Sequence, residues 1–142
     1  MVSYQRDDGD QTWFRGDDFL VRHDLSHYAI DNILGYRTAF LGMINQGMDI
    51  RDFEDRGKRG RLQITMEAWY AENLANLFLI ELSQGKFEDF NRISQATMRQ
   101  TKPDLPPLYL DSRDIGRIRS YLQELIDRWN SLPPGKQLIL EY

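Results

Sequence analysis

The chain of 142 residues contains no cysteine, which excludes disulfide bonds and thiolate metal sites and fits a reducing cytoplasm. Long apolar runs are also missing, since no segment reaches the roughly 18 uncharged apolar residues that a transmembrane helix needs. The first residues, MVSYQRDDGDQTWF, do not have the basic-then-apolar order of a signal peptide. We therefore expect a soluble cytoplasmic protein without a membrane partner.

Clustered positive charge is scarce, because 18 Lys and Arg residues face 22 Asp and Glu residues, for a formal net charge of -4. A nucleic-acid-binding protein needs clustered Lys and Arg to contact phosphates, so we expect no nucleic-acid partner. The most basic run, RDFEDRGKRGR at residues 51–61, mixes acidic with basic residues and is better explained as a solvated loop between helices. Neither a P-loop nor a G-x-G-x-x-G motif is present, so no nucleotide site is predicted.

The overall composition is that of a globular protein, with 41% hydrophobic and 28% charged residues and no low-complexity tract. A chain of this length forms one ordinary domain and has enough apolar material for a core. We therefore predict a single domain over residues 1–142.

Strand patterns occur near both ends of the chain. Apolar and polar residues alternate on either side of Asp8-Gly9, a pair that is typical of a hairpin turn. Residues 19–21, Phe-Leu-Val, indicate a further short extended piece. The C-terminal residues 137–142, QLILEY, alternate in the same way and predict a final strand that pairs with the N-terminal hairpin.

Three segments with helical spacing of apolar residues predict the main helices. They are residues 24–46, residues 62–84, and a third segment from Asp111-Ser112 to just before Pro133. The first two are expected to stop at Gly47 and Gly85, because the left-handed conformation that ends many helices suits glycine.

Residues 86–110 are expected to be irregular, because prolines interrupt the run KPDLPP at 102–107. The predicted fold class is therefore α+β, with three main α-helices packed on a small antiparallel sheet formed by the N-terminal hairpin and the C-terminal strand. The two long helices carry more apolar surface than this sheet and the third helix cover, so we expect a homodimer, with coverage by residues 86–110 of the same chain as the alternative.

His23 and His27 are the only histidines, and they lie four residues apart in the first predicted helix. At about 100° per residue they share one sector with Asp31, while the helix is apolar on two sides. Such a polar stripe needs partners, since an unsatisfied buried polar group costs roughly 1–3 kcal/mol. Two imidazoles at this spacing can share a divalent metal such as zinc, with Asp31 as a ligand or an orienting acceptor for His27. An N-cap at Asp24 would instead place His23 outside the helix.

A carboxylate of the second predicted helix is a candidate to complete the site. Glu67 and Glu81 fall on the apolar side that should be buried, whereas Glu72 falls on the exposed arc. Glu67 and Glu81 lie roughly 21 Å apart along a helix, so a compact site uses only one of them. Antiparallel neighbouring helices favour Glu81, and a loop that brings the helix starts together favours Glu67. Both alternatives stay open.

The segment His23-Asp24-Leu25-Ser26-His27 resembles the H-E-x-x-H helix of zinc-dependent peptidases, with aspartate in place of the glutamate. In those enzymes the glutamate is the general base beside the zinc-bound water. Asp24 is one methylene shorter, so the resemblance fails at the residue that the chemistry needs most.

A wider resemblance covers most of the chain and is to a family of small uncharacterised bacterial proteins. It rests on the motif H-D-L-x-H-x-x-x-acid from His23 to Asp31, together with Trp129 and residues 132–135, Leu-Pro-Pro-Gly. The resemblance implies a fold and a bacterial source. It brings no known activity.

Two functions remain open, and no catalytic residue is assigned. In the first, the protein binds a small ligand or a protein partner at a polar pocket near His23 and His27. In the second, it is a metal-binding protein or a metal-dependent hydrolase, in which the two histidines and a carboxylate hold a divalent ion such as zinc. The carboxylate candidates are Asp31, Glu67 and Glu81.

Overall fold

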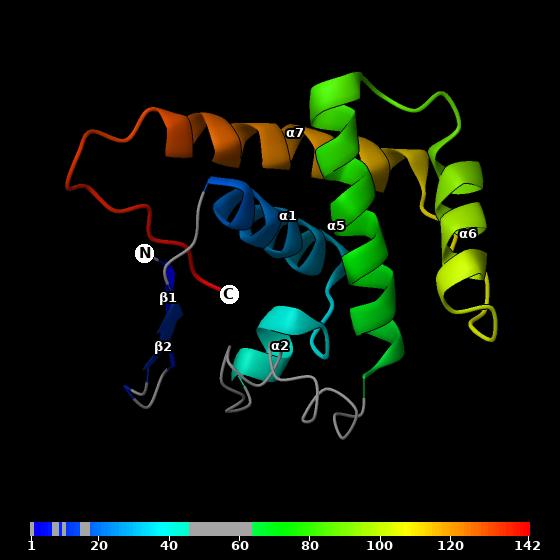
Figure 1. The fold of residues 1–142 in the computed structure, drawn as a ribbon, viewed down its shortest axis with the longest axis horizontal. Helices are drawn as coiled ribbons and strands as arrows, with labels where there is room; N and C mark the ends of the chain where they lie inside the picture. Colours follow the sequence, from blue (N-terminus) through cyan, green and yellow to red (C-terminus); the bar gives the residue numbers. More distant parts are fainter. Residues whose placement is uncertain (1, 7–8, 10, 15–17, 46–63) are drawn as a thin grey trace.

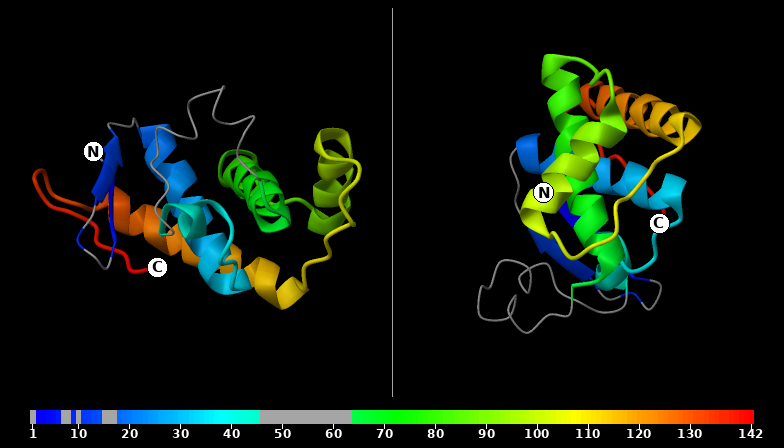
Figure 2. Two further views of the ribbon diagram at one scale, coloured as in Figure 1. Left: turned by 90° about the horizontal axis from the view of Figure 1, so that it is seen from below. Right: turned by 90° about the vertical axis from the view of Figure 1, so that its right-hand side faces the viewer.

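The structure is a computed structural model that describes residues 2–6, 9, 11–14, 18–45 and 64–142. Its elements, in chain order, are β1 (Val2–Gln5), β2 (Gln11–Phe14), α1 (Asp18–Leu34), α2 (Phe40–Asn45), α5 (Met66–Gln84), α6 (Phe90–Thr101) and α7 (Ser112–Asn130). Helix α1 packs against both α5 and α7 (Figure 1). The axis of α5 crosses the other two steeply, as the views in Figure 2 also show.

The core lies where these three helices meet. Small residues contribute to it, because Ala29 on α1 and Ala71 and Ala75 on α5 are fully buried. Side chains of this size let helix axes approach closely at a crossing. The larger buried side chains around them are Ile30, Leu74, Phe78, Ile118, Leu122 and Leu125. No helix in the described part of the chain is long and apolar enough to span a bilayer.

Helices α5 and α7 lie within the segments that the apolar spacing predicts, although α5 begins at Met66 rather than at residue 62. Thr65 caps the start of α5, since its hydroxyl accepts a hydrogen bond from the backbone N–H of Ala68 at 3.1 Å. Gly85 ends α5 with a φ of 95°, which confirms the predicted stop. The Asp111 carboxylate accepts from the backbone N–H of Arg113 at 2.7 Å and caps α7. Polar side chains therefore define both helix starts.

The first helix differs from its predicted bounds at both ends. It begins at Asp18, so residues 19–21 are helical rather than extended. It ends at Leu34, and Gly35 follows with a φ of 70°, a conformation that favours glycine. The chain turns helical again in α2, so the predicted single helix over 24–46 is two helices. The expected stop at Gly47 and the basic run at 51–61 lie outside the described residues.

Helix α6 lies in the segment that was expected to be irregular. The carboxylate of Asp89 accepts from the backbone N–H of Arg92 at 3.2 Å and caps it. Its buried residues, Phe90, Ser94 and Met98, recur every four residues and form one narrow stripe, and the partly buried Ile93 also packs against the core. The prolines of 102–107 follow this helix and do not interrupt it.

The predicted α+β class is wrong, because the structure is mostly helical and the helices pack on one another rather than on a sheet. Among the described residues, strand pairing is confined to the short β1–β2 ribbon, in which Val2 lies opposite Phe14. Residues 137–142 form no strand. The tail instead follows α1: the Tyr28 hydroxyl donates to the carbonyl of Glu141, and the Tyr142 hydroxyl donates to that of Tyr36. The alternation of apolar and polar residues in the tail therefore reflects its packing against a helix and not pairing in a strand.

Candidate metal centre

His23 and His27 lie inside α1, one turn apart. Because the helix begins at Asp18, Asp24 is not its N-cap, and the geometry of residues four apart applies to both imidazoles. The ring centroids are 4.7 Å apart, and the rings meet edge to face at 73°. The Ser26 hydroxyl donates to the carbonyl of His23 at 2.5 Å, within the same turn of helix. The two Nε2 atoms therefore reach the same side of α1.

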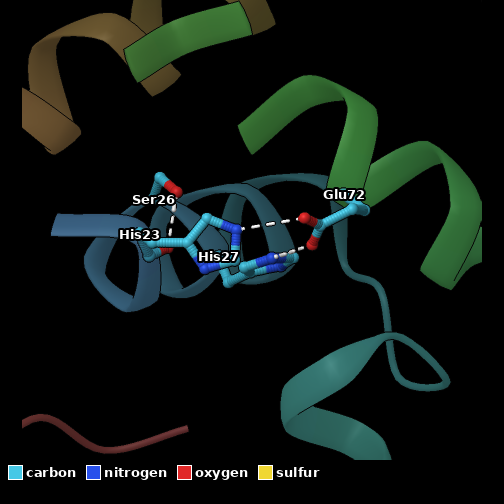
Figure 3. A network of polar contacts seen from close by, with 4 residues as sticks. All are labelled: His23, Ser26, His27 and Glu72. Carbon is cyan, nitrogen blue, oxygen red and sulfur yellow. Dashed lines mark hydrogen bonds and ion pairs between the residues drawn. The ribbon is translucent and has the colours of Figure 1, made fainter. Parts of the chain in front are cut away.

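Glu72 of α5 lies opposite this pair and contacts both rings (Figure 3). Its Oε1 lies 3.2 Å from Nε2 of His23, and its Oε2 lies 2.8 Å from Nε2 of His27. The three side chains offer ligand atoms that all lie within 4.8 Å of one another. We call this arrangement of His23, His27 and Glu72 the His–His–Glu cluster.

Burial changes steadily across the cluster. The exposed fraction of the side chain is 2% for His27, 22% for His23 and 52% for Glu72. The cluster is therefore anchored in the helix interface at His27 and reaches solvent at Glu72. A small molecule or ion can approach from the Glu72 side.

The electrostatics of the cluster favour a charged carboxylate. Burial raises the pKa of Glu72, but the hydrogen bonds with His23 and His27 and their charges outweigh it, so the net pKa lies far below the ordinary glutamate value. The hydrogen bond with Glu72 raises the pKa of His23, although burial opposes this change. Glu72 is thus an anion over the whole neutral range, as a metal ligand has to be.

The structure does not bring Glu81 or Glu67 to the histidines. Glu81 lies near the end of α5, where its carboxylate pairs with Arg119 of α7. Glu67 lies at the start of α5, where its carboxylate accepts hydrogen bonds from the backbone N–H groups of Arg37 and Thr38 and from the Thr38 hydroxyl. The helix α1 crosses α5 steeply, and the histidines contact Glu72, which lies away from both ends of α5.

Asp31 lies one turn beyond His27 but stays outside the cluster. It has no exposed surface, and neither carboxylate oxygen meets hydrogen-bond geometry with a described residue, although the backbone N–H of Leu41 lies close to the carboxyl group. Burial raises the pKa of Asp31 to about 7, the charge of Glu67 adds to the shift, and the backbone N–H of Leu41 and the charge of Arg37 oppose it. Its predicted contact with His27 is not among the hydrogen bonds between described residues.

Asp24, which stands where the zinc peptidases have their glutamate, lies beside Tyr4 of β1. Burial raises the pKa of Asp24, while the Tyr4 hydroxyl and the charges of His23 and His27 oppose the shift. The same neighbourhood raises the pKa of Tyr4, chiefly through burial. This carboxyl group is therefore near the cluster and is held by the N-terminal ribbon.

Glu72 is the residue that sequence reasoning missed. The helical pattern places it correctly on the exposed side of its helix, and for that reason it was not a candidate ligand. A metal site at the edge of a helix interface can, however, use a half-exposed side chain as a ligand. The position of Glu72 on the helical wheel of α5 is the only sequence signal for it, and that position alone does not mark it as a ligand. The missing information is the angle at which the two helices cross.

Comparison of the chain with protein-family models, curated proteins and solved structures gave no match. No relative therefore supplies a function by analogy. The functional assignment depends on the geometry of the His–His–Glu cluster itself.

Proposed function

We propose that this protein binds a divalent transition-metal ion, such as zinc, through Nε2 of His23, Nε2 of His27 and the carboxylate of Glu72. The observation that carries the proposal is the convergence of these three ligand atoms, within 4.8 Å of one another, from two helices that are distant in sequence. Nitrogen and oxygen ligands of this kind are those of catalytic and structural zinc sites.

A bound cation explains the arrangement better than two hydrogen bonds alone. Without an ion, both Nε2 atoms have to carry protons toward one carboxylate, and full protonation would place two positive rings 4.7 Å apart. A divalent ion would bind Nε2 of each neutral imidazole in place of these protons, and each ring would then carry its single proton on Nδ1. Two atoms bound to one tetrahedral zinc ion at about 2.0–2.1 Å lie about 3.4 Å apart, so a pair of ligand atoms at 4.8 Å has to contract by about 1.4 Å. The half-exposed Glu72 side chain has the freedom to follow an ion that both imidazoles bind.

The ligand set favours some metals over others. Imidazole nitrogen suits zinc, copper, iron and nickel, whereas calcium and magnesium prefer oxygen ligands throughout. With two nitrogen donors and one carboxylate, we propose a first-row transition metal, and zinc is the natural first choice for a cytoplasmic protein without thiols. The cytoplasmic location is itself part of this proposal.

Three protein ligands leave a coordination position open. In the described part of the chain no fourth His, Asp or Glu belongs to the cluster, so water or a small ligand completes the shell. A zinc-bound water has a pKa of about 7, so part of it is hydroxide at neutral pH. Metal-assisted hydrolysis of a small substrate is therefore the second candidate function, and the open position is the feature that favours it.

The direct test is elemental analysis of protein purified without a nickel column. We expect stoichiometric metal in the native chain and its loss in Glu72→Gln, which removes the ligand charge and keeps the side-chain size. Glu67→Gln is the matched control, because Glu67 is a carboxylate of the same helix outside the cluster. Circular dichroism establishes that each variant is folded. A native protein that neither contains metal nor binds added zinc would refute the proposal.

A further inference from the structure

An exposed aromatic ring lies beside the outer histidine of the proposed metal site. Phe19 precedes His23 by one helical turn on α1, and 63% of it is exposed. Its ring lies nearly parallel to that of His23, with an interplanar angle of 23° and centroids 6.5 Å apart. Phe19 therefore extends the surface of the outer histidine with a flat apolar face.

The cluster also fixes the side from which a ligand can reach the ion. His27 is almost fully buried, whereas His23 and Glu72 are partly exposed, so the open coordination position faces the rim that those two residues form. Phe19 lies beside His23, one of the two residues that form this rim. A molecule that binds an ion there and extends past His23 would meet the aromatic ring.

Charge limits the ligand further. Counted over the three ligand groups alone, a divalent ion held by two neutral imidazoles and one carboxylate would keep one net positive charge, which a singly charged anion balances. The neighbouring Asp24 carboxyl group interacts with Tyr4 on β1. Asp18, next to Phe19, is engaged with Arg22 at 2.9 Å and with the indole N–H of Trp129 at 3.1 Å.

Given the proposed metal site, we infer that its ligand or substrate is a small, singly charged molecule that chelates the ion through oxygen atoms and packs a flat apolar group on Phe19. Aromatic pairs contribute about 0.5–1.5 kcal/mol beyond the area they bury, which corresponds to a roughly 2- to 12-fold gain in affinity. Phe19 is then a specificity-determining residue, and the metal supplies most of the binding.

The test compares two probes with one chelating group, acetohydroxamate and benzohydroxamate, on the zinc-loaded full chain. Titration calorimetry gives the ratio of their affinities. We expect the preference for benzohydroxamate to fall by about 2- to 12-fold in Phe19→Ala, with zinc affinity unchanged. Tyr109→Ala is the control, because this exposed aromatic residue lies between α6 and α7 and should leave the ratio unchanged. Phe19→Leu serves if the alanine variant does not fold.

The outcomes separate the two proposals. An unchanged ratio in a zinc-binding Phe19 variant, or zinc-loaded protein that binds neither hydroxamate, would overturn the inference about Phe19 and leave the metal site intact. Failure of the native chain to bind zinc would overturn both.

Discussion

Glu81 of α5 and Arg119 of α7 form a two-point ion pair across the helix crossing. Nε of Arg119 donates to Oε1 at 2.9 Å, and Nη2 donates to Oε2 at 2.6 Å. The buried Glu81 carboxylate also accepts the backbone N–H of Phe87 at 2.8 Å. These contacts account for a glutamate on the apolar side of its helix without any metal.

Removal of Arg119 alone should be costly, because it leaves the Glu81 carboxylate buried and unpaired. We expect Arg119→Leu to lower the free energy of unfolding by about 3–5 kcal/mol. The double variant Glu81→Gln/Arg119→Leu should lose less, since the neutral amide oxygen still accepts from Phe87. Urea unfolding of both variants measures the difference, and equal losses would show that the unpaired charge is not the cause.

Asp31→Asn should stabilise the protein at high pH. Burial raises the pKa of Asp31 from 3.8 to about 7, so the stabilising contribution of its protonated form is complete below about pH 3.8 and lost as the pH rises through about 7. The asparagine variant carries no buried charge at any pH. Relative to the native chain, we expect the free energy of unfolding of the variant to be higher by about 2–4 kcal/mol at pH 8 and nearly unchanged near pH 4. The size follows from roughly 1.4 kcal/mol per pKa unit. Urea titrations across this range check it, and a difference independent of pH would contradict it.

In the metal-free protein, Glu72→Gln should lower the pKa of His23, because the hydrogen bond with Glu72 is the main cause of its elevation. NMR titration of the imidazole resonances measures this change, with Glu67→Gln as the control. The interaction between His23 and Glu72 also makes the free energy of unfolding depend on pH. The His23 contribution is complete below about pH 6.5 and lost above its folded pKa, and the Glu72 contribution is complete above about pH 4.5 and lost in acid. Glu72→Gln should therefore lower the free energy of unfolding most between these two pH values.

Gly42 and Gly116 should respond in opposite ways to alanine. A Cβ atom at Gly42 would overlap the backbone carbonyl group of Arg37, which cannot move without disturbing the link between α1 and α2. A Cβ atom at Gly116 on α7 meets nothing within 4 Å. We expect Gly42→Ala to destabilise by about 1–3 kcal/mol and Gly116→Ala to stabilise by about 0.5–1 kcal/mol. Thermal unfolding measures both, and a neutral Gly42→Ala would contradict the close approach.

Local signals in the sequence account for much of the helical structure. Gly85 and Asp111 mark the end of α5 and the start of α7, because a glycine with positive φ and a capping carboxylate act within a few residues. The spacing of His23 and His27 likewise indicates one helix face, and both lie in the cluster. These features depend on local chain geometry alone.

The failures concern contacts between distant segments. The alternation of Leu138 and Leu140 predicts a strand, but both residues pack against the helical core, which satisfies the same pattern without pairing. Glu72 is not predicted as a ligand because the helical pattern places it on the exposed arc, and whether an exposed side chain reaches a neighbouring helix depends on how the two helices cross. A crossing angle depends on how side chains of both helices interdigitate, and a single segment does not encode it.

The origin of the three side chains in the cluster has a consequence for assembly of the native state. His23 and His27 become neighbours as soon as their own turns of helix form, so a transient helix in the denatured chain already presents both nitrogens. Glu72 arrives only when α5 docks. An ion should accordingly bind in two stages, weakly to the nascent helix and more tightly after α5 has docked. The increase in metal affinity would then report that the two helices have come together.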